Sequence, residues 1–279
     1  MYLWGMTVTG ASAIRITKIN DGVSAVQDDF LAAEEPLQIG LVFGEKSHRE
    51  KKSISVTMRT PGNDEELALG FLFTEGIISQ KKDGMGFSSS APNTIDIELN
   101  ESSTPDLKRL ERNFYTTSSC GVCGKSSIDA IRTVTTRSNE ADNILISKDI
   151  LVSLPSILRR TQHVFEQTGG LHASAIFDLS GKLLFFREDV GRHNALDKVI
   201  GHAFRNDLMP LSSHILLLSG RASFELIQKA AMAGIKVVAA VGAPSTLAVE
   251  LAIEFDMTLV GFLRGSHFNI YCGEKRIAV

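Results

Sequence analysis

The sequence predicts an α/β fold in two parts, a small β-rich α+β domain first and a larger α/β domain after it. Three observations lead to this prediction. The first part alternates β-branched with polar residues, the last part alternates short apolar runs with amphipathic segments, and 43% of the 279 residues are hydrophobic against 22% charged. That composition excludes full-length disorder, and the length suits two modest domains or one large one.

The N-terminal part is predicted to hold several strands and one helix. Alternating residues predict half-buried strands over 13–19, 37–43 and 53–59, and a further short strand over 94–99. After Pro61 and Gly62, the segment Asn63-Asp64-Glu65-Glu66 predicts a helix that packs on these strands. Asn63 is the predicted N-cap, and Glu66 is expected to reach back to it.

The C-terminal part is more regular. Residues 172–177 and 182–187 predict a hairpin whose turn places Gly181 at positive φ. After it, helices and strands are predicted to alternate over residues 194–205, 214–219, 223–233, 236–241, 246–255 and 257–263. This alternation predicts right-handed crossovers and a mixed, largely parallel sheet with helices on both faces. The predicted division is residues 1–118 for the first domain, 119–135 for a cysteine-bearing loop and its helix, and 136–279 for the α/β domain.

Charge and hydropathy exclude several classes of partner. The 29 Lys and Arg against 32 Asp and Glu leave a net charge of −3, so no global positive field attracts nucleic acid or acidic lipid. The longest apolar run, residues 237–253, is interrupted by Pro244 and Glu250 and does not predict a membrane span. The first residues lack the pattern of a secretory signal. We therefore expect a cytoplasmic protein with no nucleic acid or membrane partner.

The sharpest motif is Ser119-Cys120-Gly121-Val122-Cys123-Gly124-Lys125. Glycines beside both thiols, the lysine and the start of the helix predicted after the loop all favour an exposed, reactive thiolate. Two other interpretations stay open from the residues alone: a pair of buried apolar cysteines, or half of a zinc site. A four-cysteine zinc site is disfavoured because only Cys272 remains, although a mixed site with histidines stays open. Cys272 itself is expected to be a small structural residue of a C-terminal hairpin.

A second motif, Gly169-Gly170-Leu171-His172-Ala173-Ser174, is similar to the His-x-Glu sequence of zinc-dependent nucleobase deaminases. Ser174 stands where those enzymes use a proton-shuttling Glu, and the C-x-x-C lies upstream instead of downstream. The motif therefore agrees with a deaminase-like fold but not with deamination, and we expect no metal. The alternative for His172 is a histidine that is satisfied at the start of a strand.

Three junctions between predicted elements combine glycine with arginine: Gly191-Arg192-His193, Gly220-Arg221 and Arg264-Gly265-Ser266-His267. Carboxyl ends of parallel strands meet at one edge of a sheet, so the arginines are expected to surround a phosphorylated ligand there. The alternative is that Asp189 or Asn194 caps the helix while Arg192 and His193 are solvated. None of the junctions is a G-x-G-x-x-G or Walker-type loop, so the common nucleotide-binding folds are not predicted.

Taken together, the motifs resemble the FdhD family of formate dehydrogenase accessory proteins. The resemblance rests on the cysteine motif, on Gly169-Gly170-Leu171-His172-Ala173-Ser174-Ala175 and on Arg187-Glu188-Asp189-Val190-Gly191-Arg192-His193-Asn194-Ala195. Two further motifs of the family, Ser219-Gly220-Arg221 and Gly261-Phe262-Leu263-Arg264-Gly265, follow in the order in which the family has them. The turn Arg59-Thr60-Pro61-Gly62 also matches the family. The similarity runs from about Ile39 to the C-terminus.

The resemblance implies a sulfur carrier protein required for formate dehydrogenase activity. Such a sulfurtransferase accepts sulfur from a cysteine desulfurase as a cysteine persulfide. It transfers that sulfur to molybdenum bis-molybdopterin guanine dinucleotide before this cofactor enters formate dehydrogenase. The resemblance also implies a cytidine-deaminase-like C-terminal domain, a homodimer, and GDP as a surrogate ligand for the cofactor.

Carried over by position, the resemblance makes Cys120 the persulfide intermediate and Cys123 a supporting or resolving thiol. The implied cofactor contacts are Phe262, Leu263, Arg264, Gly265, Ser266 and His267, with Arg192, His193, Gly220 and Arg221 as further candidates. Two alternatives of another class stay open. One is a non-catalytic cofactor chaperone whose cysteines only dock the desulfurase, and the other is a dithiol oxidoreductase that cycles between thiol and disulfide.

Overall fold

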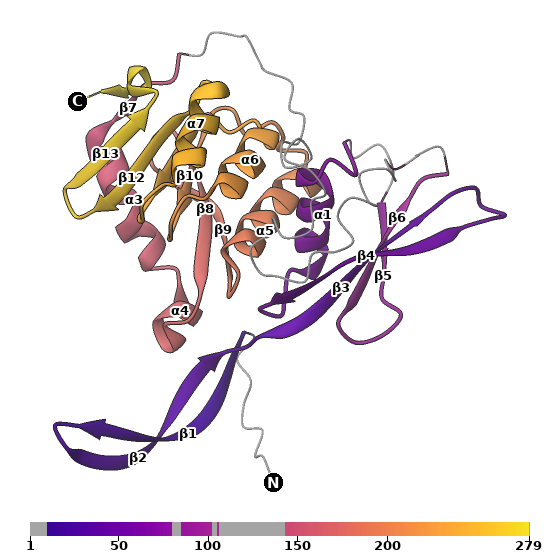
Figure 1. The fold of residues 1–279 in the computed structure, drawn as a ribbon, viewed down its shortest axis with the longest axis horizontal. Helices are drawn as coiled ribbons and strands as arrows, with labels where there is room; N and C mark the ends of the chain where they lie inside the picture. The colour runs from indigo at the N-terminus through magenta and orange to yellow at the C-terminus, as the bar shows by residue number, and fades with distance from the viewer. Residues whose placement is uncertain (1–9, 80–84, 102–104, 106–142, 279) are drawn as a thin grey trace.

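The structure is a computed structural model, and it describes residues 10–79, 85–101, 105 and 143–278. The predicted loop and helix of residues 119–135, with both motif cysteines and the predicted domain boundaries, lie outside the described residues. The described chain forms a two-stranded arm, a four-stranded sheet, a six-stranded sheet and a short two-stranded pair (Figure 1).

The arm consists of β1 (Ala11–Asn20) and β2 (Val23–Ala32), which pair antiparallel and extend away from the body of the molecule (Figure 1). The sequence predicts β1 but not β2. The tip of the arm exposes large apolar side chains, including Ile19, Val23 and Val26. An isolated two-stranded hairpin is marginally stable in water, so the base of the arm depends on its contacts with the body.

The N-terminal sheet has the strand order β4-β3-β6-β5. Its strands are β3 (Glu35–Phe43), β4 (Glu50–Arg59), β5 (Met85–Ser88) and β6 (Thr94–Leu99). Helix α1 (Asp64–Thr74) covers one face, where Leu67 and Leu72 pack against Leu37, Ile39 and Ile97. The strands predicted over 37–43, 53–59 and 94–99 and the helix that covers them are confirmed, whereas the strand predicted over 13–19 lies in the arm and not in this sheet.

The predicted start of α1 is right in position but wrong in mechanism. Asn63 is the N-cap residue, but it adopts a left-handed conformation with φ 57° and its side chain makes no capping hydrogen bond. In that conformation the short side chain is not aimed at the exposed N–H groups of the first turn. Glu66 does not reach back either, because its carboxylate binds Arg187 and His202 of the other domain.

The C-terminal sheet is mixed, with the strand order β13-β12-β11-β10-β8-β9. Its strands are β8 (His172–Asp178), β9 (Leu183–Asp189), β10 (His214–Leu218), β11 (Val237–Ala240), β12 (Thr258–Arg264) and β13 (His267–Cys272). The prediction of a largely parallel sheet needs correction, because parallel pairing is confined to β10, β11 and β12. Two strands that run in the same direction, β9 and β10, are separated by the antiparallel β8, and β13 folds back on β12.

Helices cover both faces of this sheet, as the sequence predicts. One face packs against α5 (Arg192–Arg205), α6 (Phe224–Met232) and α7 (Thr246–Glu254). The other packs against α3 (Lys148–Arg159), which is followed by the short α4 (His163–Thr168). The short strands β7 (Ile146–Ser147) and β14 (Ile277–Ala278) pair with each other, and the 3-10 helix η3 (Glu274–Arg276) precedes β14. The cytidine-deaminase-like detail stays a prediction.

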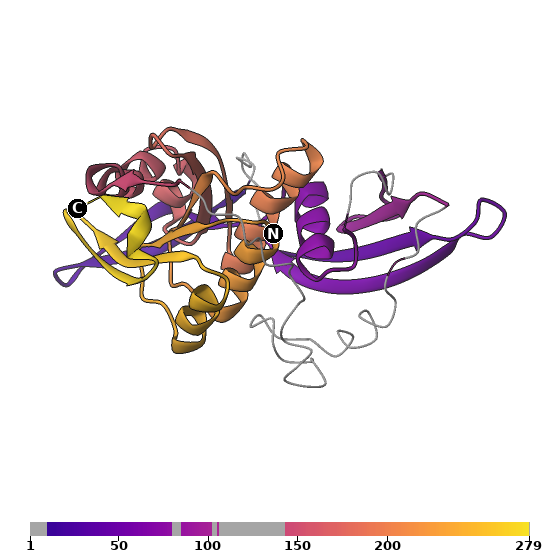
Figure 2. The ribbon, with the colours of Figure 1, turned by 90° about the horizontal axis from the view of Figure 1, so that it is seen from above.

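Helices α1 and α5 join the two parts of the chain and lie between the two sheets (Figures 1 and 2). Their backbones almost touch at Gly70 and Gly201. A Cβ atom built on either glycine would lie 1.8 Å from a carbonyl oxygen of the facing helix, that of Asp197 or of Glu66. Only glycine permits so close an approach at this crossing. Within the described ranges, no helix has the length and apolar character that a membrane crossing requires.

Candidate functional site

The carboxyl ends of four strands meet at one edge of the C-terminal sheet. Strands β10, β11 and β12 are parallel neighbours, and β9 runs in the same direction because β9 and β10 both pair antiparallel with β8. β8 itself starts at this edge with His172, which pairs with Asp189 at the end of β9. We call this strip the basic edge and define it by the side chains His172, Arg192, His193, Arg221 and Arg264.

Backbone hydrogen bonds hold the loops of the basic edge side by side. The N–H of Ser219 donates to the carbonyl of Ala173 (3.0 Å), that of Gly242 to Gly220 (2.9 Å), and that of Phe262 to Gly242 (3.0 Å). These bonds continue the pairing past the ends of β10 and β11. They bring the predicted Gly220-Arg221 and Phe262 to His267 segments to one surface of the protein.

His172 lies in a strongly positive environment. Its pKa is lowered first by burial and then by the positive charges of Arg192, His193 and Arg221. A Cβ atom on Gly220 would lie 3.2 Å from Nδ1 of His172, so the glycine leaves room for the imidazole ring. This grouping of basic side chains favours a bound anion and disfavours the protonated form of His172 without one. His172 does stand at the start of a strand, as the alternative from the sequence has it. That alternative does not account for the basic side chains around it.

His193 contacts the first turn of α6. Its Nε2 lies 3.3 Å from Oγ of Ser223 and 3.7 Å from Oε2 of Glu225. Burial alone would raise the pKa of Glu225, but the contact with His193 and the polar groups at the start of α6 lower it to about 2. The sequence reasoning missed Glu225, although its place just after the Gly220-Arg221 junction is a usable signal.

Arg192 and His193 begin α5, and the polar residues beside them turn inward. Asp189 is fully buried, and Asn194 is 9% exposed. Neither acts as a surface helix cap, because Gly191 is the N-cap residue and no side-chain capping bond forms there. The sequence alternative of simple capping is therefore wrong for this helix. Arg192 and His193 are half-buried and not fully solvated.

The turn between β12 and β13 carries the residues implied as cofactor contacts. Phe262 is 41% exposed at a β-bulge and has φ 53°, which is a rare conformation for a bulky side chain. Arg264 is exposed and its Nε donates to the carbonyl of Val241 (3.1 Å). Gly265, with φ 56°, and the exposed Ser266 and His267 complete the turn. Leu263 differs from the others, because its side chain is fully buried in the core under α3.

Of the three cysteines, only Cys272 falls within the described residues. It is half-buried at the end of β13, and its Sγ lies 3.4 Å from the carbonyl oxygen of Met257. Burial is the main cause that raises the pKa of its thiol, which disfavours the reactive thiolate. This environment agrees with the structural role predicted for it. Over residues 10–79, 85–101 and 143–278, no three His, Cys, Asp or Glu side chains group closely enough to hold a metal ion.

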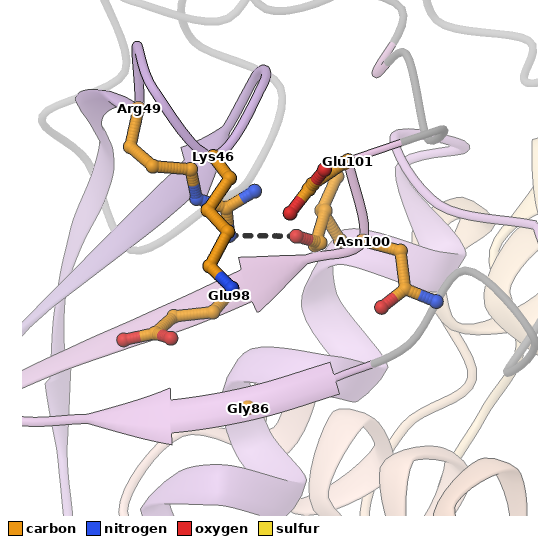
Figure 3. A pocket seen from close by; sticks show the side chains of 7 residues that line it. Lys46, Arg49, Gly86, Glu98, Asn100 and Glu101 are labelled. Atoms are coloured by element: carbon orange, nitrogen blue, oxygen red, sulfur yellow. Dashed lines mark hydrogen bonds between the residues drawn. The ribbon is translucent and has the colours of Figure 1, made fainter.

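A pocket of about 500 Å³ lies elsewhere, in the N-terminal sheet (Figure 3). Lys46 and Arg49 form one wall, Glu98 and Glu101 contribute opposite charges, and Arg49 donates to the carbonyl of Leu99 (2.7 Å). No sequence-predicted site residue lines this pocket. Its positive charges are matched by carboxylates, so it lacks the unbalanced charge that an anionic ligand needs. We therefore place the candidate site at the basic edge.

Comparisons with known proteins identify relatives over most of the chain. The model of the FdhD/NarQ family matches residues 33–278. A relative in Streptomyces coelicolor, named sulfur carrier protein FdhD, is 49% identical over 277 residues, which cover 95% of each chain. Relatives of the same name in Mycobacterium tuberculosis and Sulfurisphaera tokodaii are 45% and 40% identical and cover 94% and 95% of this chain. The alignments cover 97% and 98% of those relatives.

A solved structure shares the fold. It is the crystal structure of a protein described as a formate dehydrogenase accessory protein, from Desulfotalea psychrophila. The TM-score is 0.75 at 22% identity, and the superposition covers 96% of this chain and 100% of the other. At that identity, the likeness supports the fold alone.

Proposed function

The chain belongs to the FdhD/NarQ family, and on that premise we propose that it is a sulfur carrier that serves the maturation of formate dehydrogenase. In this proposal, a cysteine desulfurase supplies the sulfur, and the chain holds it as a persulfide on Cys120. It then transfers the sulfur to molybdenum bis-molybdopterin guanine dinucleotide, which is the substrate of the carrier and not its resident cofactor.

The loading step is a thiol exchange. The Cys120 thiolate attacks the outer sulfur of the desulfurase persulfide, a new S–S bond forms, and the desulfurase cysteine leaves as a thiolate. Glycines on both sides of the thiol and the neighbouring Lys125 favour this chemistry, because they permit exposure and stabilise negative charge. Cys123 either shares the sulfur or resolves a trapped intermediate.

The observation that carries the cofactor part of the proposal is the convergence of cations at the basic edge. The substrate carries diphosphate groups, and arginine binds phosphate oxygens through two N–H donors at once. Arg264 and Arg221 are exposed at this edge, and Gly265 leaves the approach to Arg264 free of a side chain. Phe262, exposed beside them, presents a flat apolar face to a guanine base.

Two experiments test the proposal. Mass spectrometry after incubation with a cysteine desulfurase and cysteine is expected to show one added sulfur atom on the peptide that contains Cys120, and none in Cys120→Ala. A disulfide between Cys120 and Cys123 without added sulfur would support the dithiol oxidoreductase instead. Cofactor binding without any persulfide would support the non-catalytic chaperone.

Isothermal titration with GDP tests the ligand assignment. Arg264→Ala is expected to weaken GDP binding about tenfold or more, because it removes a charge-assisted contact to phosphate. Sulfur loading of Cys120 is expected to stay unchanged in the same variant. Equal GDP affinity in wild type and Arg264→Ala would remove Arg264 from the ligand site.

The proposal includes formate dehydrogenase and the desulfurase as partners, a homodimer, and a cytoplasmic location. The exposed apolar side chains at the tip of the arm support an assembly of more than one chain, because such side chains gain stability when they are covered. Light scattering at micromolar concentration tests the dimer, and a single-chain mass would contradict it.

A further inference from the structure

We propose that Asp189 is a positioning residue that ties the basic edge to the N-terminal domain, so that an anionic diphosphate ligand binds tightly only while this carboxylate is in place. The inference rests on the proposed function for the ligand, and it concerns a residue that does not touch that ligand.

Asp189 is completely buried, and both of its oxygens are fully engaged. Oδ1 accepts from the N–H of Gly191 (2.8 Å) and from Nδ2 of Asn194 (3.1 Å). Oδ2 accepts from the N–H of Thr60 (3.1 Å) and forms an ion pair with Nζ of Lys198 (2.7 Å). A carboxylate offers about four lone-pair positions, and here each one has a donor.

The donors come from both parts of the chain. Gly191 starts helix α5, and Asn194 and Lys198 lie on that helix, whereas Thr60 belongs to the turn that follows β4 of the N-terminal sheet. One buried group therefore sets where α5 begins and where the N-terminal domain meets it. Its carboxylate is the contact between the two parts of the chain that lies directly behind the basic edge.

The N–H, the carbonyl and the hydroxyl of Thr60 all bond to residues of the C-terminal part. Besides its N–H, its carbonyl accepts from Nζ of Lys198 (2.8 Å) and its Oγ1 accepts from the N–H of Val190 (3.1 Å). Asn194 adds a further hydrogen bond between the two parts of the chain, since its Nδ2 donates to the carbonyl of Met58 (2.7 Å). The loop from Val190 to Gly191 is thus fixed from both sides.

Arg192 and His193 directly follow this fixed loop. Both side chains contribute to lowering the pKa of His172 across the basic edge, and His193 also contacts Ser223. A ligand that needs several cations at set distances depends on the position of this first helical turn. In enzymes, displacing the groups that position a substrate by about 1 Å can lower the reaction rate about 10²-fold. We expect ligand binding at the basic edge to be sensitive to position for the same reason.

The change Asp189→Asn keeps the shape but not the acceptors. An amide has one oxygen acceptor and an NH₂ group that only donates. Two of the four donors around Asp189 would then face another donor, whichever way the amide is turned. The loop must move to relieve that conflict, and Arg192 and His193 move with it.

Asp197→Asn is the matched control. Asp197 is also buried on α5 and also spans the domain junction, because it accepts from Thr74 Oγ1 (2.9 Å) and from Lys229 Nζ (2.9 Å). It lies farther along the helix and none of its partners belongs to the basic edge. If a loss of stability between the two parts of the chain were enough to weaken GDP binding, Asp189→Asn and Asp197→Asn would both lose affinity.

The test compares GDP titrations of the full-length wild type, Asp189→Asn and Asp197→Asn well below their melting temperatures, with melting and persulfide loading measured in parallel. Both variants are expected to melt lower and to load sulfur on Cys120. Only Asp189→Asn is expected to weaken GDP binding, by at least tenfold, with Asp197→Asn within twofold of wild type. Equal GDP affinity in Asp189→Asn and wild type, or an equal loss in both variants, overturns the positioning role.

Two further outcomes stay decisive. If the wild type itself does not bind GDP, the ligand assignment of the proposed function fails and the positioning role fails with it. If Asp189→Asn does not fold, Thr60→Val replaces it, because it removes only the acceptor for the N–H of Val190. Thr60→Val is expected to weaken GDP binding about threefold with little change in melting, and unchanged affinity overturns the proposal.

Discussion

Replacing Gly201 with alanine should destabilise the protein, although the same change in an exposed helix is stabilising. Alanine has a higher helix propensity than glycine by about 0.8–1.0 kcal/mol. At this crossing, however, the new Cβ would lie 1.8 Å from the carbonyl oxygen of Glu66 and 2.8 Å from the N–H nitrogen of Gly70. The sign of the effect therefore depends on whether α1 and α5 can separate.

The required separation is large. Ordinary contact of a Cβ begins at 3.4 Å, so the shortfall is 3.4 − 1.8 = 1.6 Å, and the obstacle is backbone on both sides. Overpacking of a well-packed core typically costs about 1–3 kcal/mol, and a backbone clash belongs at the upper end. After the gain in helix propensity, we expect a net loss of about 2 kcal/mol. For a chain of this size, that lowers the melting temperature by about 4–8 °C.

Thermal and urea unfolding of Gly70→Ala, Gly201→Ala and the double variant measure this effect. The two Cβ atoms obstruct the same crossing, since each would lie within 2.9 Å of the backbone nitrogen of the other glycine. Helices that have separated for one alanine have room for the second, so the double variant should lose less than the sum of the singles. A single variant that is more stable than wild type, or strictly additive losses, would refute the reasoning.

Three further predictions address other sites. Cys272→Ala should leave formate dehydrogenase maturation intact in a host that lacks the native protein. It should lower the free energy of unfolding by about 1 kcal/mol. A loss of maturation equal to that of Cys120→Ala would contradict the structural role assigned to Cys272. Glu225 has a folded pKa lowered from 4.5 to about 2, so its contribution to stability is complete above about pH 4.5 and is lost as the pH falls toward 2. Glu225→Gln should therefore flatten stability against pH in that window and not above it, and an unchanged acid limb in urea unfolding would count against the His193 contact. Protein purified without a chelator should hold no stoichiometric zinc by elemental analysis, because zinc would occupy the thiolates that carry sulfur; one zinc per chain, lost when Cys120, Cys123 or His172 is changed, would favour a metal-centred function.

Local patterns predicted most elements of the fold. The hairpin of β8 and β9, with Gly181 at φ 84°, and the strands and helices from α5 to β12 agree with the predicted order. Alternation of apolar residues is a property of neighbouring positions, so it can be detected without knowledge of partners. Strand β2 was missed for the same reason, since polar Gln27, Asp28 and Asp29 interrupt its alternation and its side chains are mostly exposed.

The sequence by itself therefore determined the family, the cysteine motif and the three Gly and Arg junctions of the candidate site. The tertiary structure decided which side chains face a ligand and which hold the domains together. Glu66 binds Arg187 across 121 positions in the chain, Asp189 binds Thr60 across 129, and Leu263 turns into the core between exposed neighbours. These contacts form because residues far apart in the chain are brought together by the fold. Periodicity in the sequence reports only on neighbouring positions, so it does not reveal which distant partner a side chain will meet.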